Sequence, residues 1–286
     1  MYPLNGATRV LCILGNPVSH SLSPAIQNAA ISACDLDYIY VPFSVRPQSL
    51  GEAVSGLRAL GVSGFNVTIP YKTAIMSYLD KLDESAAAAG AVNTVSISGD
   101  HMTGYNTDGH GLISSLADDL SFVAGSDSIV VIGAGGAARG AVAALCRAGA
   151  ERIVLANRSY NKAVQLAAEM SNRYEKTCIK VSAQDQLSEN HLNSASLLIN
   201  TTSLGMKGDR ISFVDLARLP KSAKVYDMVY SPAETPLLRE ATAKGIAAVN
   251  GLGMLAAQGE RAFTIWTGKI PPKGLMKRVL QDICHS

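Results

Sequence analysis

A glycine-rich turn in the middle of the sequence has the residues and the spacing of a dinucleotide site. The apolar run 129–132 leads into Gly133, Gly135, Gly136 and Ala138 in the pattern G-x-G-x-x-A, and a helical stretch follows. Gly133 permits a tight turn, and Gly135 lets the backbone approach a pyrophosphate. Backbone N–H groups at the start of the helix then face the phosphates, with the helix dipole behind them. We therefore expect a dinucleotide cofactor; the alternative is a glycine-rich turn without a ligand.

The end of the next predicted strand indicates which dinucleotide binds. An NAD site usually has Asp or Glu there, which accepts a hydrogen bond from the ribose 2′-OH. This chain has Asn157, Arg158 and Ser159 at that place, and Lys162 follows one turn later. A guanidinium, a hydroxyl and an ammonium group favour a 2′-phosphate, which a carboxylate would repel. The sequence thus predicts NADP, and the alternative is that Arg158 and Lys162 are merely solvated.

Three polar clusters in the first part of the chain suit a small, polyhydroxylated and anionic ligand. Residues 19–24 concentrate hydroxyl groups beside a predicted strand end and helix start. Residues 66–72 place polar groups at the carboxyl end of a strand, where α/β sheets hold ligands. Residues 93–94 and 106–108 add amides and one carboxylate.

Each cluster also has a plain structural interpretation. Ser23 precedes Pro24 and fits the N-cap of a helix over 24–34, whatever else it does. Asn106 and Asp108 fit a turn and a cap, and a lone lysine such as Lys72 at a helix start is often only solvated. The residues alone leave these alternatives open.

The elements that must position these residues alternate along the chain, which is typical of an α/β protein with parallel sheets. In the first part we expect a helix over 47–60 and a hairpin of 92–97 with 102–105, an antiparallel pair on an otherwise parallel sheet. The clearest later helices are 136–148, 160–172, 254–266 and 273–283. The predicted strands outside the hairpin are 10–14, 38–45, 64–69, 129–132, 152–156, 178–181, 197–199, 224–226 and 247–249.

Length and composition exclude several classes of protein. The chain has 286 residues, 48% of them hydrophobic, and a formal charge of +2, so it is neither disordered nor electrostatically suited to nucleic acid. No apolar run approaches the roughly 18–20 residues that span a bilayer, and we recognise no signal peptide. The five cysteines are scattered and without a CxxC, and the five histidines lack ligand spacing, so we expect reduced thiols, a cytoplasmic protein and no metal site.

Segments spread over nearly the whole chain resemble the signature segments of the shikimate dehydrogenases. They are GNPVSHSLSP (15–24), NVTIPYK (66–72), GAVNT (90–94), GYNTDG (104–109), GAGGAARG (133–140), NRS (157–159), NTTSLGM (200–206), YDMVYSPAETPLL (226–238) and NGLGMLAAQGERAF (250–263). The resemblance implies a substrate domain of residues 1–107 completed by C-terminal helices in 251–286, and a Rossmann-like NADP-binding domain of residues 108–250. It also implies reversible reduction of 3-dehydroshikimate to shikimate by NADPH.

The same resemblance implies a role for individual residues. Lys72 and Asp108 match the catalytic pair, in which a protonated Lys72 supplies the proton and the positive charge that a developing alkoxide needs. Ser21 and Ser23 match ligands of the substrate carboxylate. The other implied substrate contacts are Thr68, Lys72, Asn93, Asp108, Tyr230 and Gln258. The implied cofactor contacts are Gly133, Gly135, Gly136, Ala137, Asn157, Arg158, Ser159, Lys162, Met228 and Gly251.

Two rival interpretations stay open. One is a quinate/shikimate dehydrogenase with relaxed substrate and cofactor choice; serine at position 23, where relatives that favour quinate often have threonine, leans toward shikimate. The other is a dinucleotide-binding regulator without catalysis, which the presence of both Lys72 and Asp108 disfavours. The expected partner is a small-molecule substrate, and a homodimer is one candidate state of assembly. The role of His20 stays open between structure and substrate contact.

Overall fold

The chain folds into two compact units, which we describe separately. The computed structural model describes residues 4–125 and 127–285. One unit combines Met1–Gly111 with Leu255–Ser286, and the other is Leu112–Met254. The seams therefore follow residues 111 and 254, four residues after the seams expected from the sequence. Helices α4 (Asp108–Leu120) and α9 (Leu252–Thr267) both continue through a seam.

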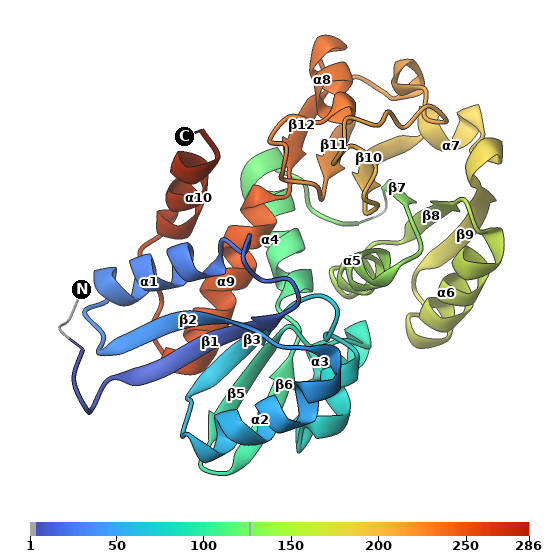
Figure 1. Ribbon diagram of the computed structural model, residues 1–286. Helices are drawn as coiled ribbons and strands as arrows, with labels where there is room; N and C mark the ends of the chain where they lie inside the picture. Colours follow the sequence, from blue (N-terminus) through green and yellow to red (C-terminus); the bar gives the residue numbers. More distant parts are fainter. Residues whose placement is uncertain (1–3, 126, 286) are drawn as a thin grey trace. The chain divides into compact units, whose positions relative to one another are not determined.

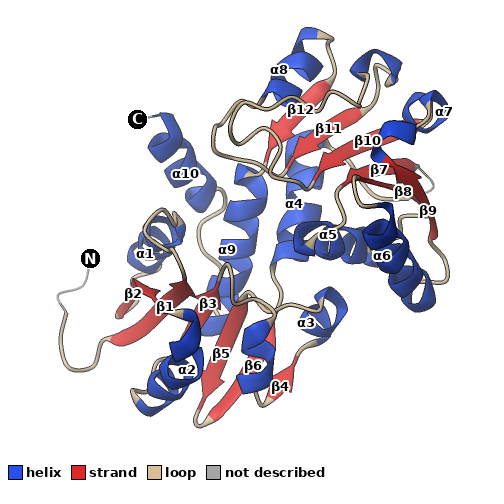
Figure 2. Cartoon of the chain, turned by 45° about the vertical axis from the view of Figure 1, so that its right-hand side comes forward, coloured by secondary structure: helices blue, strands red, loops and turns tan. Residues whose placement is uncertain are grey.

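The first unit contains a mixed six-stranded sheet with the order β2-β1-β3-β5-β6-β4; Figure 1 labels all of these strands but β4, which Figure 2 shows beside β6. Strand β1 pairs in parallel with β2 and β3, whereas β5 runs antiparallel to both β3 and β6. The predicted antiparallel hairpin on a parallel sheet is therefore confirmed. The short strand β4, parallel to β6, was not expected, because two residues carry no periodic pattern. The strands are β1 (Arg9–Gly15), β2 (Tyr38–Ser44), β3 (Gly64–Val67), β4 (Lys81–Leu82), β5 (Thr94–Ser98) and β6 (His101–Tyr105).

The longer helices of the first unit lie close to where the sequence predicts them, with one correction at Ser23, whereas the short helices Ala74–Tyr78 and Glu84–Ala89 were not predicted. Ser23 is the first residue of its helix, and Leu22, which already has helical dihedrals, is the N-cap without a capping hydrogen bond from its side chain. The prediction of Ser23 as N-cap is therefore wrong, because the chain enters the helix one residue early. The helices are α1 (Ser23–Ala33), α2 (Leu50–Ala59) after a short 3₁₀ turn (Pro47–Ser49), η2 (Ala74–Tyr78), α3 (Glu84–Ala89) and α10 (Leu275–His285).

The C-terminal helices complete the first unit, as the resemblance implies. Gly64 on β3 has no side chain, so the indole of Trp266 on α9 lies directly against it; a Cβ there would come within 2.3 Å of the ring. The indole N–H of Trp266 donates to the carbonyl of Val95 at 2.9 Å. Helix α10 packs against α1. The return of the chain thereby places α9 over the sheet that carries the polar clusters.

The second unit is a doubly wound parallel sheet with the order β12-β11-β10-β7-β8-β9 (Figure 2). Side chains of β7 alternate between two cores: Ile129 and Val131 pack with α4, α5 and α6, and Val130 and Ile132 pack with α7 and α8. The chain leaves β7 for β8 on one side and later returns to β10 on the other, which makes the carboxyl end of β7 a topological switch point. The elements are β7 (Ser128–Ile132), α5 (Gly136–Arg147), β8 (Arg152–Asn157), α6 (Tyr160–Arg173), β9 (Cys178–Ala183), α7 (Glu189–Asn193), β10 (Ala195–Asn200), β11 (Lys224–Asp227), α8 (Pro236–Ala243) and β12 (Ala247–Asn250), with short 3₁₀ turns at Gln184–Gln186 and Leu216–Arg218.

Among the described residues, no helix has both the length and the apolar character that crossing a membrane requires.

Candidate active site

Lys72 follows β3 and is held beside β5 by its own backbone. The Thr68 N–H donates to the Leu14 carbonyl at 2.9 Å, which ties the end of β3 to β1. Four residues later, the Lys72 carbonyl accepts from the Val92 N–H at 2.7 Å. This second bond brings Lys72 next to Asn93, which directly precedes β5. The cluster 66–72 and the pair 93–94 therefore meet at the same edge of the sheet.

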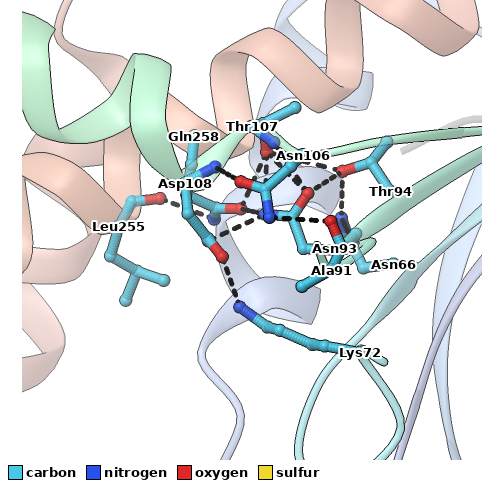
Figure 3. Close-up of polar contacts among 10 residues, drawn as sticks. All are labelled: Asn66, Lys72, Ala91, Asn93, Thr94, Asn106, Thr107, Asp108, Leu255 and Gln258. Carbon is cyan, nitrogen blue, oxygen red and sulfur yellow. Dashed lines mark hydrogen bonds and ion pairs between the residues drawn. The ribbon is translucent and has the colours of Figure 1, made fainter. Parts of the chain in front are cut away.

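An ion pair joins Lys72 to Asp108 at the start of α4 (Figure 3). The Lys72 Nζ donates to Asp108 Oδ2 at 2.5 Å, and about a third of the lysine side chain is exposed. Asp108 Oδ1 accepts from Asn93 Nδ2 at 2.8 Å, so a different partner holds each carboxylate oxygen. The ammonium group keeps access to solvent, and the carboxylate fixes its position. Such a pair can deliver a proton to a substrate oxygen at a defined place.

Asn93 is the buried centre of this polar cluster. Its Oδ1 accepts from the Thr107 N–H at 2.8 Å and from the Thr94 hydroxyl at 2.9 Å. Its Nδ2 donates to Asp108 and lies 3.4 Å from Gln258 Oε1, which comes from α9. Gln258 Nε2 in turn donates to the Leu255 carbonyl at 2.9 Å. Of the predicted residues, the structure thus brings Lys72, Asn93, Asp108 and Gln258 into one hydrogen-bonded group.

Ser21 and Ser23 lie at the start of α1 and Thr68 at the end of β3, all three in the first unit. The Ser23 N–H donates to Ser21 Oγ at 3.3 Å, and Ser23 is buried while Ser21 is half-buried. Thr68 follows β3 directly; a Cβ on Gly15 would lie 2.4 Å from its methyl group, so glycine there leaves room for Thr68. Because Ser23 does not cap α1, its hydroxyl is not committed to the helix.

Reasoning from sequence placed no site role on four residues that the structure joins to this group. Asn66, Thr94 and Thr107 stand inside the polar segments, so their residue types did give a signal. Tyr40 is fully buried on β2. A tyrosine in an apolar strand is ordinary core composition, so the sequence carries no signal for Tyr40.

The glycine-rich turn of the second unit has the geometry of a phosphate cradle. Gly133 has φ +115, and a Cβ there would lie 2.4 Å from Thr201 Oγ1, so only glycine fits. Gly135 is the N-cap of α5 and gives its first turn no side-chain hydrogen bond. A Cβ on Gly135 or Gly136 would meet nothing within 4 Å. The start of α5 is therefore open to an anion, as the predicted pyrophosphate requires.

The end of β8 fits a second phosphate. The Asn157 Nδ2 donates to the Ser159 carbonyl at 2.8 Å, which shapes the turn between β8 and α6. Arg158, Ser159 and Lys162 are exposed, and the first turn of α6 contains no acidic residue. Two cations and a hydroxyl with no carboxylate in that turn suit a 2′-phosphate. The residues present thus fit NADP better than NAD.

Met228, Tyr230 and Gly251 lie on the loops after β11 and β12 in the second unit. A Cβ on Gly251 would lie 2.4 Å from the Met228 carbonyl oxygen, so the two loops touch through a glycine. The preceding residue, Asp227, is fully buried and accepts from Asn200 Nδ2 at 2.9 Å, from the Val229 N–H at 3.0 Å and from the Thr235 hydroxyl at 2.6 Å. Burial raises the pKa of the Asp227 carboxyl, and these hydrogen bonds lower it in part. Asp227 therefore fixes the loop that presents Met228 and Tyr230.

Three family models match successive parts of the chain. Residues 13–95 match the shikimate dehydrogenase substrate binding domain, and residues 251–281 match the shikimate 5′-dehydrogenase C-terminal domain. Between them, residues 116–217 match the model described as shikimate / quinate 5-dehydrogenase.

Similar proteins extend this match to the full length. A protein of Geobacter metallireducens named shikimate dehydrogenase (NADP(+)) is 52% identical over 276 residues, which is 96% of each chain. A crystal structure of a shikimate dehydrogenase in complex with NADP+ has a TM-score of 0.91 and 39% identity, and covers 99% of this chain and 98% of that one. The Thermus thermophilus enzyme in complex with NADP(H) and shikimate has a TM-score of 0.85 and 32% identity, and covers 96% and 99%.

The fold and both sites define a two-domain α/β oxidoreductase that binds a dinucleotide at a switch point of a parallel sheet. The polar cluster around Lys72 and Asp108 belongs to the other domain. The chain belongs to the shikimate dehydrogenase family.

Proposed function

We propose that this protein catalyses the reversible, NADPH-dependent reduction of 3-dehydroshikimate to shikimate. The observation that carries the proposal is the pair of Lys72 Nζ and Asp108 Oδ2 at 2.5 Å, braced by Asn93, in a chain that also has an open glycine-rich turn. The relatives named for NADP and the structure solved with shikimate support the same reaction.

Lys72 is the proton donor in the direction of reduction. When bound, NADPH supplies a hydride to the carbonyl carbon of the substrate, and the oxygen gains negative charge. The Lys72 ammonium group offers this oxygen both a proton and a positive charge. Asp108 holds the ammonium group in place and, through its remaining lone pairs, can accept from a ring hydroxyl. In the direction of oxidation, Lys72 takes the proton back.

The remaining polar residues of the first unit bind and orient the substrate. Ser21 and Ser23 hold its carboxylate by donating from their hydroxyl groups. The Ser21 oxygen accepts from the Ser23 N–H, which leaves the Ser21 proton for the carboxylate. Thr68, Asn93 and Gln258 face its ring hydroxyls. Tyr230, on the loop after β11, is a further proposed substrate contact.

The cofactor contacts lie on the ends of β7, β8, β11 and β12. Gly133, Gly135, Gly136 and Ala137 hold the pyrophosphate with backbone N–H groups. Arg158 and Lys162 bind the 2′-phosphate, while Asn157 and Ser159 shape and line that turn. Met228 and Gly251 would line the place of the nicotinamide.

The proposal includes a cytoplasmic location. The five cysteines are all free, and Cys12 and Cys146 are buried, which suits a reducing compartment. The only binding partner that the proposal requires besides the cofactor is the small-molecule substrate. Light scattering of the purified protein distinguishes a monomer from a homodimer.

A second candidate substrate is quinate, because one matching family model is described as shikimate / quinate 5-dehydrogenase. The deciding experiment measures formation of reduced nicotinamide from shikimate or quinate, each with NADP or NAD. We expect the highest kcat/KM with shikimate and NADP. Faster turnover of quinate would replace the proposed substrate, and no turnover with any of the four pairs would refute the proposed activity.

A further inference from the structure

Tyr40 is a buried phenol that the proposed reaction does not use. It lies on β2 and is 2% exposed, and its Oη is 2.6 Å from Asn66 Oδ1. The amide oxygen has no proton, so the phenol must donate in this bond. Burial raises the pKa of Tyr40 well above its ordinary value, although an interaction with the Ser23 side chain lowers it in part. The phenol therefore keeps its proton at neutral pH.

Asn66 accepts the phenol proton through its oxygen and donates through its nitrogen to Thr94. Asn66 Nδ2 donates to the Asn93 carbonyl at 3.0 Å and to Thr94 Oγ1 at 3.1 Å. Because the carbonyl can only accept, the Asn66 amide has one possible orientation, with its oxygen toward Tyr40. Thr94 Oγ1 thus accepts from Asn66, and its single proton is donated to Asn93 Oδ1 at 2.9 Å.

The chain of hydrogen bonds ends on the proposed catalytic carboxylate. Asn93 Oδ1 receives the Thr94 hydroxyl, and Asn93 Nδ2 donates to Asp108 Oδ1 at 2.8 Å (Figure 3). Every bond from Tyr40 to Asp108 runs in the same direction. The Thr107 N–H also donates to Asn93 Oδ1, at 2.8 Å, and this one bond already decides which end of the amide faces Asp108. The Thr107 hydroxyl also lies 3.2 Å from Asn93 Oδ1, and Thr94 on β5 adds a second residue that holds this oxygen.

We propose that Tyr40 and Thr94 are positioning residues. Thr94 holds the Asn93 amide against Asp108 directly, Tyr40 acts on Thr94 through Asn66, and together they set the place of Lys72. The inference rests on the proposed function, because it assigns the two residues to the same proton transfer. It adds that the Tyr40 phenol on β2 raises kcat, although three hydrogen-bonded residues lie between it and Asp108.

The first test removes one hydroxyl at a time. Tyr40→Phe and Thr94→Val each should lower kcat for shikimate by about fivefold, because the Lys72–Asp108 pair is less ordered. The KM should change less, because neither variant removes a side chain that we propose to contact the substrate. Thr94→Ser keeps the hydroxyl and should restore kcat. Tyr38→Phe is the matched control, because it removes a phenol hydroxyl from the same strand. The Arg9 guanidinium lies over the Tyr38 ring, and this contact does not depend on the hydroxyl. A kcat of Tyr40→Phe equal to that of Tyr38→Phe would overturn the proposal.

The second test separates positioning from general loss of stability. Once Thr94→Val has broken the chain, adding Tyr40→Phe should cost no further kcat, even though urea unfolding shows further destabilisation. Losses in kcat that multiply would mean that the two residues act independently, and would overturn the proposal. If Tyr40→Phe does not fold, the comparison of Thr94→Val with Thr94→Ser still decides: equal kcat values contradict the proposal.

A readout without substrate keeps this test distinct from the test of the proposed function. The side-chain amide signal of Asn93 in the NMR spectrum, assigned by its loss in Asn93→Asp, should shift in Tyr40→Phe and stay in place in Tyr38→Phe. An unchanged signal in both variants would overturn the chain of hydrogen bonds. Should the wild-type protein fail to oxidise shikimate, the proposed function is refuted, and the amide signal still shows whether Tyr40 acts on Asn93.

Discussion

Replacing Asp108 by asparagine should nearly abolish turnover while leaving the fold in place. The carboxylate accepts from Lys72 Nζ at 2.5 Å and from Asn93 Nδ2 at 2.8 Å. An asparagine has one oxygen and one NH2 group, so either orientation points N–H groups at one of these two donors. Hydrogen bonds to a charged group contribute about 1.5–3 kcal/mol each, and losing one or both corresponds to a factor of roughly 10–10⁴. We expect kcat for shikimate oxidation to fall by about 10²-fold or more.

The assay follows reduced nicotinamide at saturating NADP while shikimate is varied, so that kcat and KM are separated. Asp80→Asn is the matched control, because it removes the charge of an aspartate that pairs with Arg58 at 2.9 Å on the surface. That variant should keep its kcat. A kcat of Asp108→Asn within about threefold of wild type would refute the reasoning, since the loss of a charged partner cannot cost so little.

Three further predictions concern cofactor choice, substrate binding and pH. Arg158→Ala should raise the KM for NADP by about 10–100-fold and change NAD turnover little; equal losses with both cofactors would show that Arg158 does not contact the 2′-phosphate. Ser23→Ala should lower kcat/KM for shikimate more than it lowers kcat. Its free energy of unfolding should fall by less than the ~1 kcal/mol expected for loss of an N-cap, because Ser23 is not the N-cap of α1. A loss of stability without a change in kinetics would mean that Ser23 does cap the helix. Burial raises the pKa of Asp227, so the ionised carboxylate is less favourable in the folded protein than in the unfolded chain. The wild-type free energy of unfolding, measured in urea, should therefore fall relative to that of Asp227→Asn as the pH rises above the ordinary aspartate range. A wild type that gains stability relative to Asp227→Asn with rising pH would contradict this prediction.

Much of the fold follows from local patterns in the sequence. The strands of the second unit are short apolar runs bounded by turn residues, and β7 is buried along its whole length, as a central parallel strand should be. The hairpin of β5 and β6 was predictable because Gly99 and Asp100 interrupt two alternating stretches; Gly99 has φ +58, which glycine adopts freely. The strand β4 could not be predicted, since its pairing with β6 depends on the tertiary fold alone.

The candidate site was predictable in its residue types more than in its contacts. Lys72, Asn93 and Asp108 stand in polar segments at strand ends, where a ligand is expected. Gln258 lies 165 residues from Asn93 in the sequence, so no local pattern could indicate their contact. The interpretation of Ser23 as N-cap was wrong because the boundary of a helix depends on the dihedrals of one residue, which a cap-favouring side chain does not determine.

The hydrogen-bonded group also includes Tyr40, which lies outside the polar segments and joins the group only through the tertiary fold. Tyr40 contacts Asn66 only because β2 and β3 flank β1 on either side. Its strand shows an ordinary apolar pattern, and a phenol there is indistinguishable from core packing until its hydrogen bond is seen. Thr94 stands in the polar segment 93–94, but the direction of its hydroxyl follows only from its two neighbours in the fold.

The measurement that tests the central claim most directly is the steady-state kinetics of Lys72→Ala with shikimate and NADP, beside the wild-type protein. The wild type should reduce NADP with shikimate, and Lys72→Ala should lower kcat by about 10²–10⁴-fold with only a modest change in the shikimate KM, because a general acid–base group contributes in that range. A near-normal kcat with the whole loss in KM would contradict the account: Lys72 would then bind the substrate, and another group would transfer the proton.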